Sequence, residues 1–265
     1  MSFATVNGIR LHYRIDDTGR ADAPWLVLAN ALGADLTMWT PQLAAFSSRF
    51  RLLRFDTRGL GCSDAPSGPY TVEQWAADLL GLLDALSIER AHFCGISMSG
   101  LTGIALAARH AERIDRLVLA HTAARIGAAE VWQARAHQVR EQGTRALADA
   151  TLQRWFSPGF AAREPLMCAA IRDAFVHADS EGYASNCEAI GAADLRAELG
   201  AIRAPTLVMA GRADASVPPG DSRALAAGVA GARFVELDAQ HLSNIERAAE
   251  FTQAVLDFLT AAPAA

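Results

Sequence analysis

The sequence of 265 residues contains no lysine, so all 24 of its basic side chains are arginine. A chain without lysine offers no side-chain amine for a Schiff base with a carbonyl substrate. It also lacks the lysine that contacts the phosphates in a nucleotide-binding P-loop. Two large classes of enzyme site are therefore excluded before any motif is considered.

Signals for disulfides, metals, membranes and nucleic acids are also missing. The four cysteines form no C-x-x-C pair, and no H-E-x-x-H or similar spacing of metal ligands occurs. No apolar run reaches the ~18 residues of a membrane span, and the first residues form no signal segment. A net charge of −5 argues against a nucleic-acid partner. We expect a cytoplasmic protein with free thiols, without a metal and without an organic cofactor.

The remaining pattern alternates short apolar runs with helical ones. Strands are predicted at residues 25–29, 51–56, 91–96, 115–121, 206–210 and 234–237, after a hairpin in residues 5–14 that turns at Asn7-Gly8. A helix begins at Thr71, where Gln74 completes a capping box, and a last helix covers residues 248–259. Strands that are apolar on both faces and alternate with helices predict an α/β fold, with a mostly parallel sheet covered on both sides.

One interval breaks this alternation. Residues 122–198 contain no convincing strand, and helical spacing is found in residues 131–155, 164–178 and 181–193. We therefore predict a core made of residues 1–122 and 199–265, with residues 123–198 inserted as a helical cap. An insertion after the sixth strand would lie over the carboxyl ends of the strands and would close a site there.

The most informative segment is Gly95-Ile-Ser97-Met-Ser99-Gly100, which lies between a predicted strand and a predicted helix. A serine at such a sharp turn has its hydroxyl lifted clear of the sheet, at a helix N-terminus that favours negative charge. This nucleophile elbow is normally written G-x-S-x-G, whereas Ser99 stands at the last position here. Ser97 is the candidate nucleophile.

Two candidate partners for Ser97 follow in the order that the elbow requires. Asp214 and His241 each lie just after the end of a predicted strand. A serine hydroxyl is a poor nucleophile, so an imidazole must take its proton and a carboxylate must hold that imidazole in the right tautomer. Asp238 is a second candidate for the acid, but it lies in a strand end too close to His241 along the chain.

The segment Asn-Ala-Leu-Gly at residues 30–33 follows a buried strand. In a sheet that ends in a nucleophile elbow, the loop after this strand supplies one N–H for a developing oxyanion, and the residue after the nucleophile supplies the other. The candidate donors are therefore the backbone amides of Leu32 and Met98. A plain turn is the alternative interpretation of residues 30–33.

Taken together, these residues resemble the α/β-hydrolase superfamily over the whole chain. Within it, the sequence is similar to the 3-oxoadipate enol-lactonases of aromatic catabolism. Four segments carry this closer similarity, at residues 30–39, 95–100, 154–160 and 241–246. Asn30 and Ala31 replace the His-Gly pair of most relatives, as they do in the enol-lactonases, whereas Ser99 replaces a usual glycine. The resemblance implies a serine hydrolase that opens a small lactone bearing a carboxylate.

Five residues of the predicted cap are candidates for substrate binding. Trp132 and Trp155 are candidates to line an apolar pocket, with packing between cap helices as the alternative. Arg125, Arg135 and Arg154 are candidates to bind a substrate carboxylate, because a guanidinium offers a fork of donors. A solvated helix face is the alternative for each arginine.

The predicted function is hydrolysis of a small-molecule lactone in the β-ketoadipate pathway, without a cofactor. The candidate site residues by themselves predict only acyl transfer to water. The lactone substrate is implied by the resemblance to the enol-lactonases. A carboxylesterase or perhydrolase with the same three side chains is the first alternative, and a non-enzymatic ligand receptor on the same scaffold is the second. A dehalogenase or an epoxide hydrolase needs an acidic nucleophile, and position 97 is serine.

Overall fold

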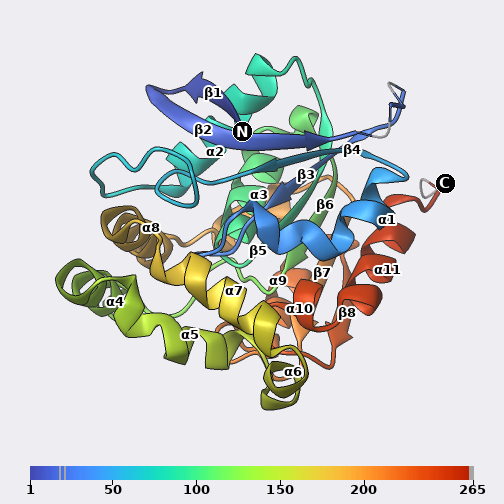
Figure 1. Cartoon of the computed structure of the whole chain (residues 1–265). Helices are drawn as coiled ribbons and strands as arrows, with labels where there is room; N and C mark the ends of the chain where they lie inside the picture. The colour runs from blue at the N-terminus through green and yellow to red at the C-terminus, as the bar shows by residue number, and fades with distance from the viewer. Residues whose placement is uncertain (18, 21, 263–265) are drawn as a thin grey trace.

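A computed structural model describes residues 1–17, 19, 20 and 22–262 of the chain. In this part of the chain, eight strands form one sheet in the order β1-β2-β4-β3-β5-β6-β7-β8 (Figure 1). The strands are β1 (Ser2–Val6), β2 (Ile9–Asp16), β3 (Trp25–Ala29), β4 (Arg51–Phe55), β5 (Ala91–Ile96), β6 (Ile114–Ala120), β7 (Thr206–Gly211) and β8 (Arg233–Leu237). β2 pairs antiparallel with β1 and β4, and all other pairs are parallel. The predicted mostly parallel sheet is confirmed.

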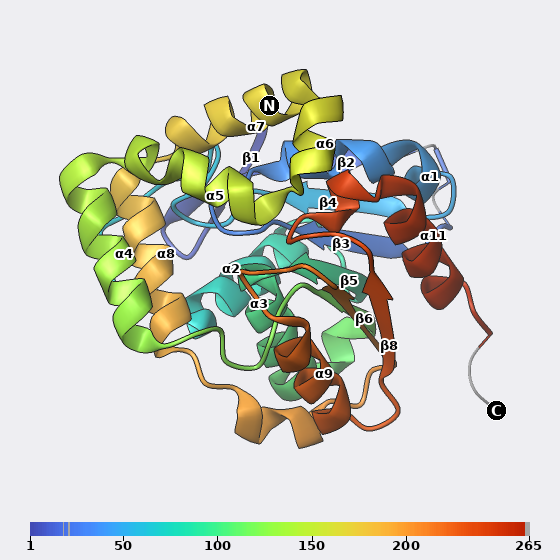
Figure 2. The same cartoon turned by 90° about the horizontal axis from the view of Figure 1, so that it is seen from below.

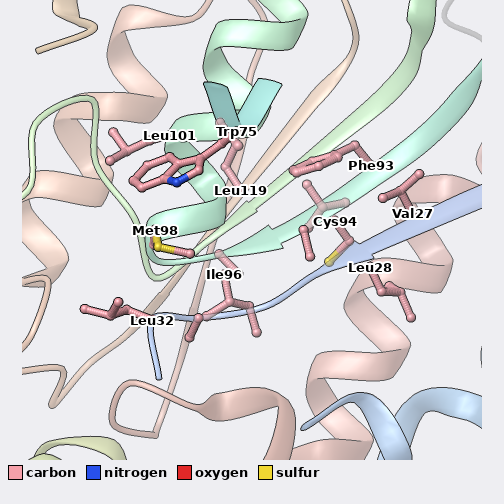
Figure 3. Close-up of a cluster of buried hydrophobic side chains, with 14 of the residues drawn as sticks. Val27, Leu28, Leu32, Trp75, Phe93, Cys94, Ile96, Met98, Leu101 and Leu119 are labelled. Atoms are coloured by element: carbon pink, nitrogen blue, oxygen red, sulfur yellow. The ribbon is translucent and has the colours of Figure 1, made fainter. Parts of the chain in front are cut away.

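The parallel part of the sheet is built from the apolar runs of the sequence. Every residue of β5 and β7 is buried, as expected for strands that are covered on both faces. Phe93 of β5 pairs with Val27 of β3, and Figure 3 shows both side chains in one apolar cluster with Leu119 of β6. This cluster lies directly beneath the ends of the strands from which the candidate site is built.

Two local signals of the sequence are found where they were predicted. Asn7 and Gly8 have φ angles of 49° and 79°, which are typical of a two-residue hairpin turn. Before the first long helix, the Gln74 amide donates to the Thr71 hydroxyl at 3.2 Å, and the Thr71 amide donates to the Gln74 side chain at 3.0 Å. The capping box is therefore complete.

Helices cover both faces of the sheet (Figure 2). One face carries α2 (Val72–Ala85), α3 (Met98–Arg109) and α9 (Pro219–Gly228), and the other carries η1 (Leu36–Gln42), α1 (Leu43–Ser47) and α11 (Ala248–Leu259). Two short helices, η2 (Ala111–Arg113) and α10 (Ser243–Glu246), lie in the connections. Within the described residues, no helix has both the length and the apolar character needed to cross a membrane.

The chain between β6 and β7 is helical, as predicted. It forms α4 (Ala129–Gln142), η3 (Thr144–Leu147), α5 (Ala148–Trp155), α6 (Pro158–Arg163), α7 (Pro165–Val176) and α8 (Ser180–Ala192), which lie together as one group in Figure 1. The next helix, η4 (Arg196–Ala201), returns to the core, where its Glu198 pairs with Arg109 of α3. The division of the chain into a core and a cap at residues 123–198 stays a prediction.

Candidate active site

Ser97 lies at the turn between β5 and α3. Its φ of 57° and ψ of −117° are unusual for a residue other than glycine, and this conformation lifts the side chain off the sheet. The turn is held because the Ser97 amide donates to the Ala120 carbonyl at 2.9 Å, and the Gly100 amide donates to the Ser97 carbonyl at 2.8 Å. The Ser97 hydroxyl lines a cavity and has no hydrogen-bond partner among the described residues. It is therefore free to meet a substrate.

The unusual Ser99 of the elbow is accommodated by a hydrogen bond. Its buried hydroxyl donates to the Asn30 carbonyl at 2.5 Å. Helix and strand approach each other closely at Gly95, where an added Cβ would be 2.7 Å from the Ser99 carbonyl oxygen. Serine at position 99 therefore does not separate α3 from the sheet, and it joins the elbow to the loop after β3.

The side chain of Asn30 organises that loop. Its Nδ2 donates to the Phe55 carbonyl at 2.9 Å, and its Oδ1 accepts from the Trp39 indole at 3.0 Å. Both ends of the buried amide thus bond to the protein rather than to the cavity. Gly33 follows with a φ of 79°, and an added Cβ there would lie 2.6 Å from the Phe175 ring of α7. Asn30 and Gly33 therefore shape the loop, and neither lines the cavity of Ser97.

The two predicted oxyanion donors lie at the ends of neighbouring strands. Leu32 follows β3 and Met98 follows β5, and these strands are paired in parallel. Figure 3 shows both residues at the same edge of the sheet. Neither amide donates a hydrogen bond to any residue that the structure describes. Both N–H groups are thus available to an external oxygen, and their role as oxyanion donors stays a prediction.

Asp214 and His241 are in contact. The Nδ1 of His241 lies 2.8 Å from Oδ2 of Asp214, while Oδ1 accepts from the amides of Ser216 and Val217 at 2.8 and 2.9 Å. Burial alone would raise the pKa of Asp214, but the charge of His241 and the imidazole hydrogen bonds outweigh it and hold the pKa well below its usual range. Asp214 is therefore ionised near neutral pH.

The rival acid Asp238 is placed differently. Its side chain is 72% exposed, and it pairs at the surface with Arg247 and Arg212. His241 itself is fixed by its own loop, because Glu246 accepts from the Gln240 amide at 2.9 Å. The geometry therefore favours Asp214 over Asp238 as the partner of His241.

Ser97 and His241 line one small cavity of about 40 Å³, which is room for a few water molecules. Its lining combines the strand ends of the core with side chains from α4, α5 and α8. The remaining lining residues are Leu32, Ile126, Trp132, Arg135, Thr151, Arg154, Trp155, Tyr183, Ser216 and Val217. Four of the five predicted cap residues are therefore brought to the candidate nucleophile.

Two arginines on this lining lack an anionic partner. Arg135 donates to the Tyr183 hydroxyl at 2.8 Å and to the Thr151 hydroxyl at 3.0 Å. Arg154 has neither a hydrogen bond from its side chain nor an ion pair within the described part of the chain. Burial and the nearby charge of Arg135 lower the pKa of Arg154, but a guanidinium stays protonated in proteins. The cavity therefore presents two positive charges beside Ser97.

Comparison with known proteins identifies the family of the chain. A family model described as the alpha/beta hydrolase fold matches residues 24–163. The chain belongs to the α/β-hydrolase family. This assignment confirms the fold class that the elbow and the alternating pattern of strands and helices predicted from the sequence.

Several relatives of this hydrolase are similar over nearly its full length. The 3-oxoadipate enol-lactonases 2 and 1 of Acinetobacter baylyi are 41% and 39% identical to it, over 95% and 91% of this chain and 93% and 90% of theirs. A crystal structure of the enol-lactonase from Burkholderia xenovorans LB400 is 60% identical, with a TM-score of 0.97, and covers 98% of this chain and 100% of its own. A thermophilic esterase from Thermogutta terrifontis is 28% identical, with a TM-score of 0.90 and coverage of 98% of both chains. The predicted resemblance to enol-lactonases and the predicted class of ester-bond hydrolase are confirmed.

The two tryptophans of this hydrolase both line the cavity and hold cap helices. The Trp132 indole donates to the Ile126 carbonyl at 2.6 Å. Trp155 packs edge-on against Phe175 of α7, with ring centroids 5.7 Å apart. The two interpretations that the sequence left open are therefore compatible with each other.

Arg125 is not at the site, contrary to the prediction. It is exposed and lines a different cavity, together with Arg196 and Asp221. The physical reason is the path of the chain, because Leu195 donates its amide to the Ala124 carbonyl at 2.8 Å. This bond holds residues 124 and 125 beside the end of the cap rather than over Ser97.

Sequence reasoning missed His121, which directly follows β6. Its Nδ1 lies 2.9 Å from Oδ2 of Asp214, and its Nε2 lies 2.6 Å from the Ser243 hydroxyl. The strand order could have indicated this residue. β6 lies between β5 and β7, so the residue that follows β6 must lie between Ser97, which follows β5, and Asp214, which follows β7.

His121, Asp214 and His241 place ligand-type atoms within 4.8 Å of one another. Each imidazole is already joined to the carboxylate by a hydrogen bond, and these bonds account for the short distances. The prediction that the hydrolase needs no metal and no organic cofactor stays a prediction.

Proposed function

We propose that this hydrolase opens a small lactone that carries a carboxylate, and that 3-oxoadipate enol-lactone is its substrate. The observation that carries the proposal is the pair Arg135 and Arg154, which faces the candidate nucleophile without an anionic partner. The identity to the two Acinetobacter enol-lactonases and to the Burkholderia enol-lactonase supports the same substrate class.

The electrostatic argument concerns desolvation. A carboxylate loses part of its hydration when it enters a partly enclosed cavity, and this is costly unless charged hydrogen-bond donors replace the water. Arg154 supplies such donors, and Arg135 adds a second positive charge whose neutral partners do not cancel it. A lactone without a carboxylate would place its uncharged ring beside the guanidinium groups of Arg135 and Arg154 and would leave both positive charges without a partner.

The reaction that we propose begins with proton transfer from Ser97 to Nε2 of His241. Ser97 Oγ then attacks the ring carbonyl, and the amides of Leu32 and Met98 stabilise the developing oxyanion. Asp214 holds His241 with its proton on Nδ1, so that Nε2 is the free base. When the tetrahedral intermediate collapses, the ring carbon–oxygen bond breaks and the proton on Nε2 of His241 passes to the leaving enolate, which stays attached to the acyl group.

The leaving group of an enol-lactone makes this step easier than the cleavage of a simple ester. An enolate leaves more readily than an alkoxide, and the released enol becomes a ketone, which draws the reaction forward. Water then attacks the acyl-enzyme with His241 as the base and releases the free acid. A place in the β-ketoadipate pathway and a cytoplasmic location stay predictions from the sequence.

The test compares the free acid of the enol-lactone with its methyl ester. In the wild type, we expect the acid to have a kcat/KM at least about 30-fold higher, because loss of a buried charge pair costs about 2–5 kcal/mol. Arg154→Ala should remove most of this preference by slowing the acid, while it spares the methyl ester and p-nitrophenyl acetate. Arg125→Ala is the matched control, because its exposed side chain lines another cavity.

Equal rates for acid and methyl ester in the wild type would overturn the carboxylate proposal. The plain carboxylesterase would then be the better assignment, in line with the similarity to the Thermogutta esterase. An unchanged acid preference in Arg154→Ala, together with its loss in Arg135→Ala, would keep the substrate class and move the contact to Arg135.

A further inference from the structure

The Asp214 carboxylate is saturated with hydrogen bonds. Two backbone amides bond to Oδ1 at 2.8 and 2.9 Å. Two imidazoles share Oδ2, with His241 at 2.8 Å and His121 at 2.9 Å. A carboxylate has about four acceptor positions, so both oxygens are fully used and the group cannot rotate without breaking bonds.

We propose that His121 is a positioning residue, whose hydrogen bond to Oδ2 fixes Asp214 and, through it, holds His241 in the orientation that proton transfer with Ser97 requires. This inference rests on the serine mechanism proposed above. His121 does not reach the cavity, because it is fully buried and its other nitrogen is bonded to Ser243. Its effect must therefore pass through the carboxylate.

The surroundings of His121 fix its proton on Nδ1. Burial lowers the pKa of His121, so the ring is neutral near pH 7 in spite of its acidic neighbour. A neutral imidazole has one donor and one acceptor. Because Asp214 is ionised and accepts only, Nδ1 must carry the proton, and Nε2 must accept from the Ser243 hydroxyl at 2.6 Å.

The backbone also argues for a specific role. His121 has a φ of 52°, in the left-handed region that histidine, asparagine and aspartate enter more readily than other side chains. Its amide donates to the Met209 carbonyl at 2.7 Å, which continues the pairing of β6 with β7. The chain thus holds a strained conformation that aims the imidazole at Asp214.

The shared oxygen also changes the charge that Asp214 presents to His241. The His121 N–H offsets part of the negative charge on Oδ2, which His241 contacts as well. The other charged groups near this pair are Glu246 of the His241 loop and the two cap arginines, Arg135 and Arg154. These groups stay in place when only His121 is changed.

Two substitutions separate positioning from simple packing. His121→Leu fills a similar volume without a donor, whereas His121→Asn suits the left-handed backbone and offers an N–H near the position of Nδ1. For His121→Leu, we expect kcat to fall about tenfold, and the acid limb of kcat/KM to move up by about 0.5–1 pH unit. His121→Asn should keep most of the rate and an acid limb close to that of the wild type.

The measurements are pH profiles with p-nitrophenyl acetate and ¹⁵N NMR titrations of the imidazoles in the wild type and both variants. The NMR titration follows His241 directly and needs no substrate, so it tests His121 even if the lactone proposal fails. Retention of activity in Ser97→Ala would instead refute the serine mechanism itself. If His121→Leu does not fold, the wild-type spectrum still decides the matter through the tautomer of His121.

An unprotonated Nδ1 on His121 in the wild type would overturn the proposal. So would an acid limb in His121→Leu that stays unchanged or moves to lower pH. Equal shifts in the leucine and asparagine variants would show that the imidazole acts by packing alone. A protonated Nδ1, with an upward shift in His121→Leu and recovery in His121→Asn, is the expected result.

Discussion

The side chains that support the candidate site from the sheet and the arginines that line its cavity from the helices above differ in how completely they are paired. On the sheet side, Asp214 accepts four hydrogen bonds and both ends of the Asn30 amide are bonded. On the cap side, Arg154 has no partner within the described residues and Arg135 has only neutral ones. The sheet side is thus organised before a substrate arrives, whereas the cap side still lacks an anion.

Packing shows the same contrast. Every residue of β5 is buried, whereas the buried residues of α4, which carries Arg135, are Ala136 and Val139. Segments with few buried apolar contacts open at lower free energy than core strands. We therefore expect α4 to open more readily than the strands that carry the candidate site.

The largest expected effect is on the sheet side, at the candidate nucleophile. Ser97→Ala should reduce kcat by about 10⁶-fold, because the remaining groups cannot form the acyl-enzyme. Its thermal unfolding should match that of the wild type, because the removed hydroxyl has no partner among the described residues. A variant that kept even about a tenth of the activity would mean that the elbow does not supply the nucleophile.

The next effect distinguishes the two acids near His241. Asp214→Asn should lower kcat by about 10⁴-fold, because an amide favours the wrong tautomer of His241. Asp238→Asn is the matched control, and it should change kcat little because its side chain is 72% exposed. Measurement of kcat for both variants at one pH is sufficient, and the reverse ranking would refute the assignment of Asp214.

The smallest effect compares a buried core histidine with an exposed cap histidine. Burial lowers the pKa of His92, so below about pH 6.5 the unfolded chain takes up a proton that the folded protein resists. The free energy of unfolding should therefore decrease as the pH falls from 7 to 5, which means that the protein becomes less stable. His92→Phe should reduce that decrease.

The control for this third prediction is His177→Asn, because His177 is an exposed residue after α7. It should leave the pH dependence of urea unfolding unchanged. The same slope in wild type and His92→Phe would show that His92 does not contribute to the acid sensitivity of the core.

Local patterns were sufficient for the sheet and for most of the site. The apolar runs at β5 and β7 are short and continuous, and the turns after them carry Ser97 and Asp214, so strand order alone brings these residues to one edge. The helical character of residues 129–192 also follows from side-chain spacing. These features depend on residues that are close together in the chain, so a single sequence is enough to predict them.

Contacts between residues far apart in the chain could not be predicted from such local patterns. The position of Arg125 depends on the amide of Leu195, seventy residues later, and no periodicity encodes that bond. His121 was missed because its partners, Asp214 and Ser243, come from two other connections of the sheet. A role for such a residue can be predicted only when the order of the strands, and therefore which strand ends are neighbours, is known.

The bond between Ser99 and Asn30 has a practical consequence for protein engineering. It joins the two segments that carry Leu32 and Met98 without any residue of the predicted cap, whereas Gly33 of the same loop packs against Phe175 of α7, so a new cap would have to keep that contact. A foreign cap could be grafted after Thr122, whose hydroxyl donates to the Ser97 carbonyl at 2.8 Å and must be retained. Such chimeras would exchange substrate preference between relatives while the reactive machinery stays native.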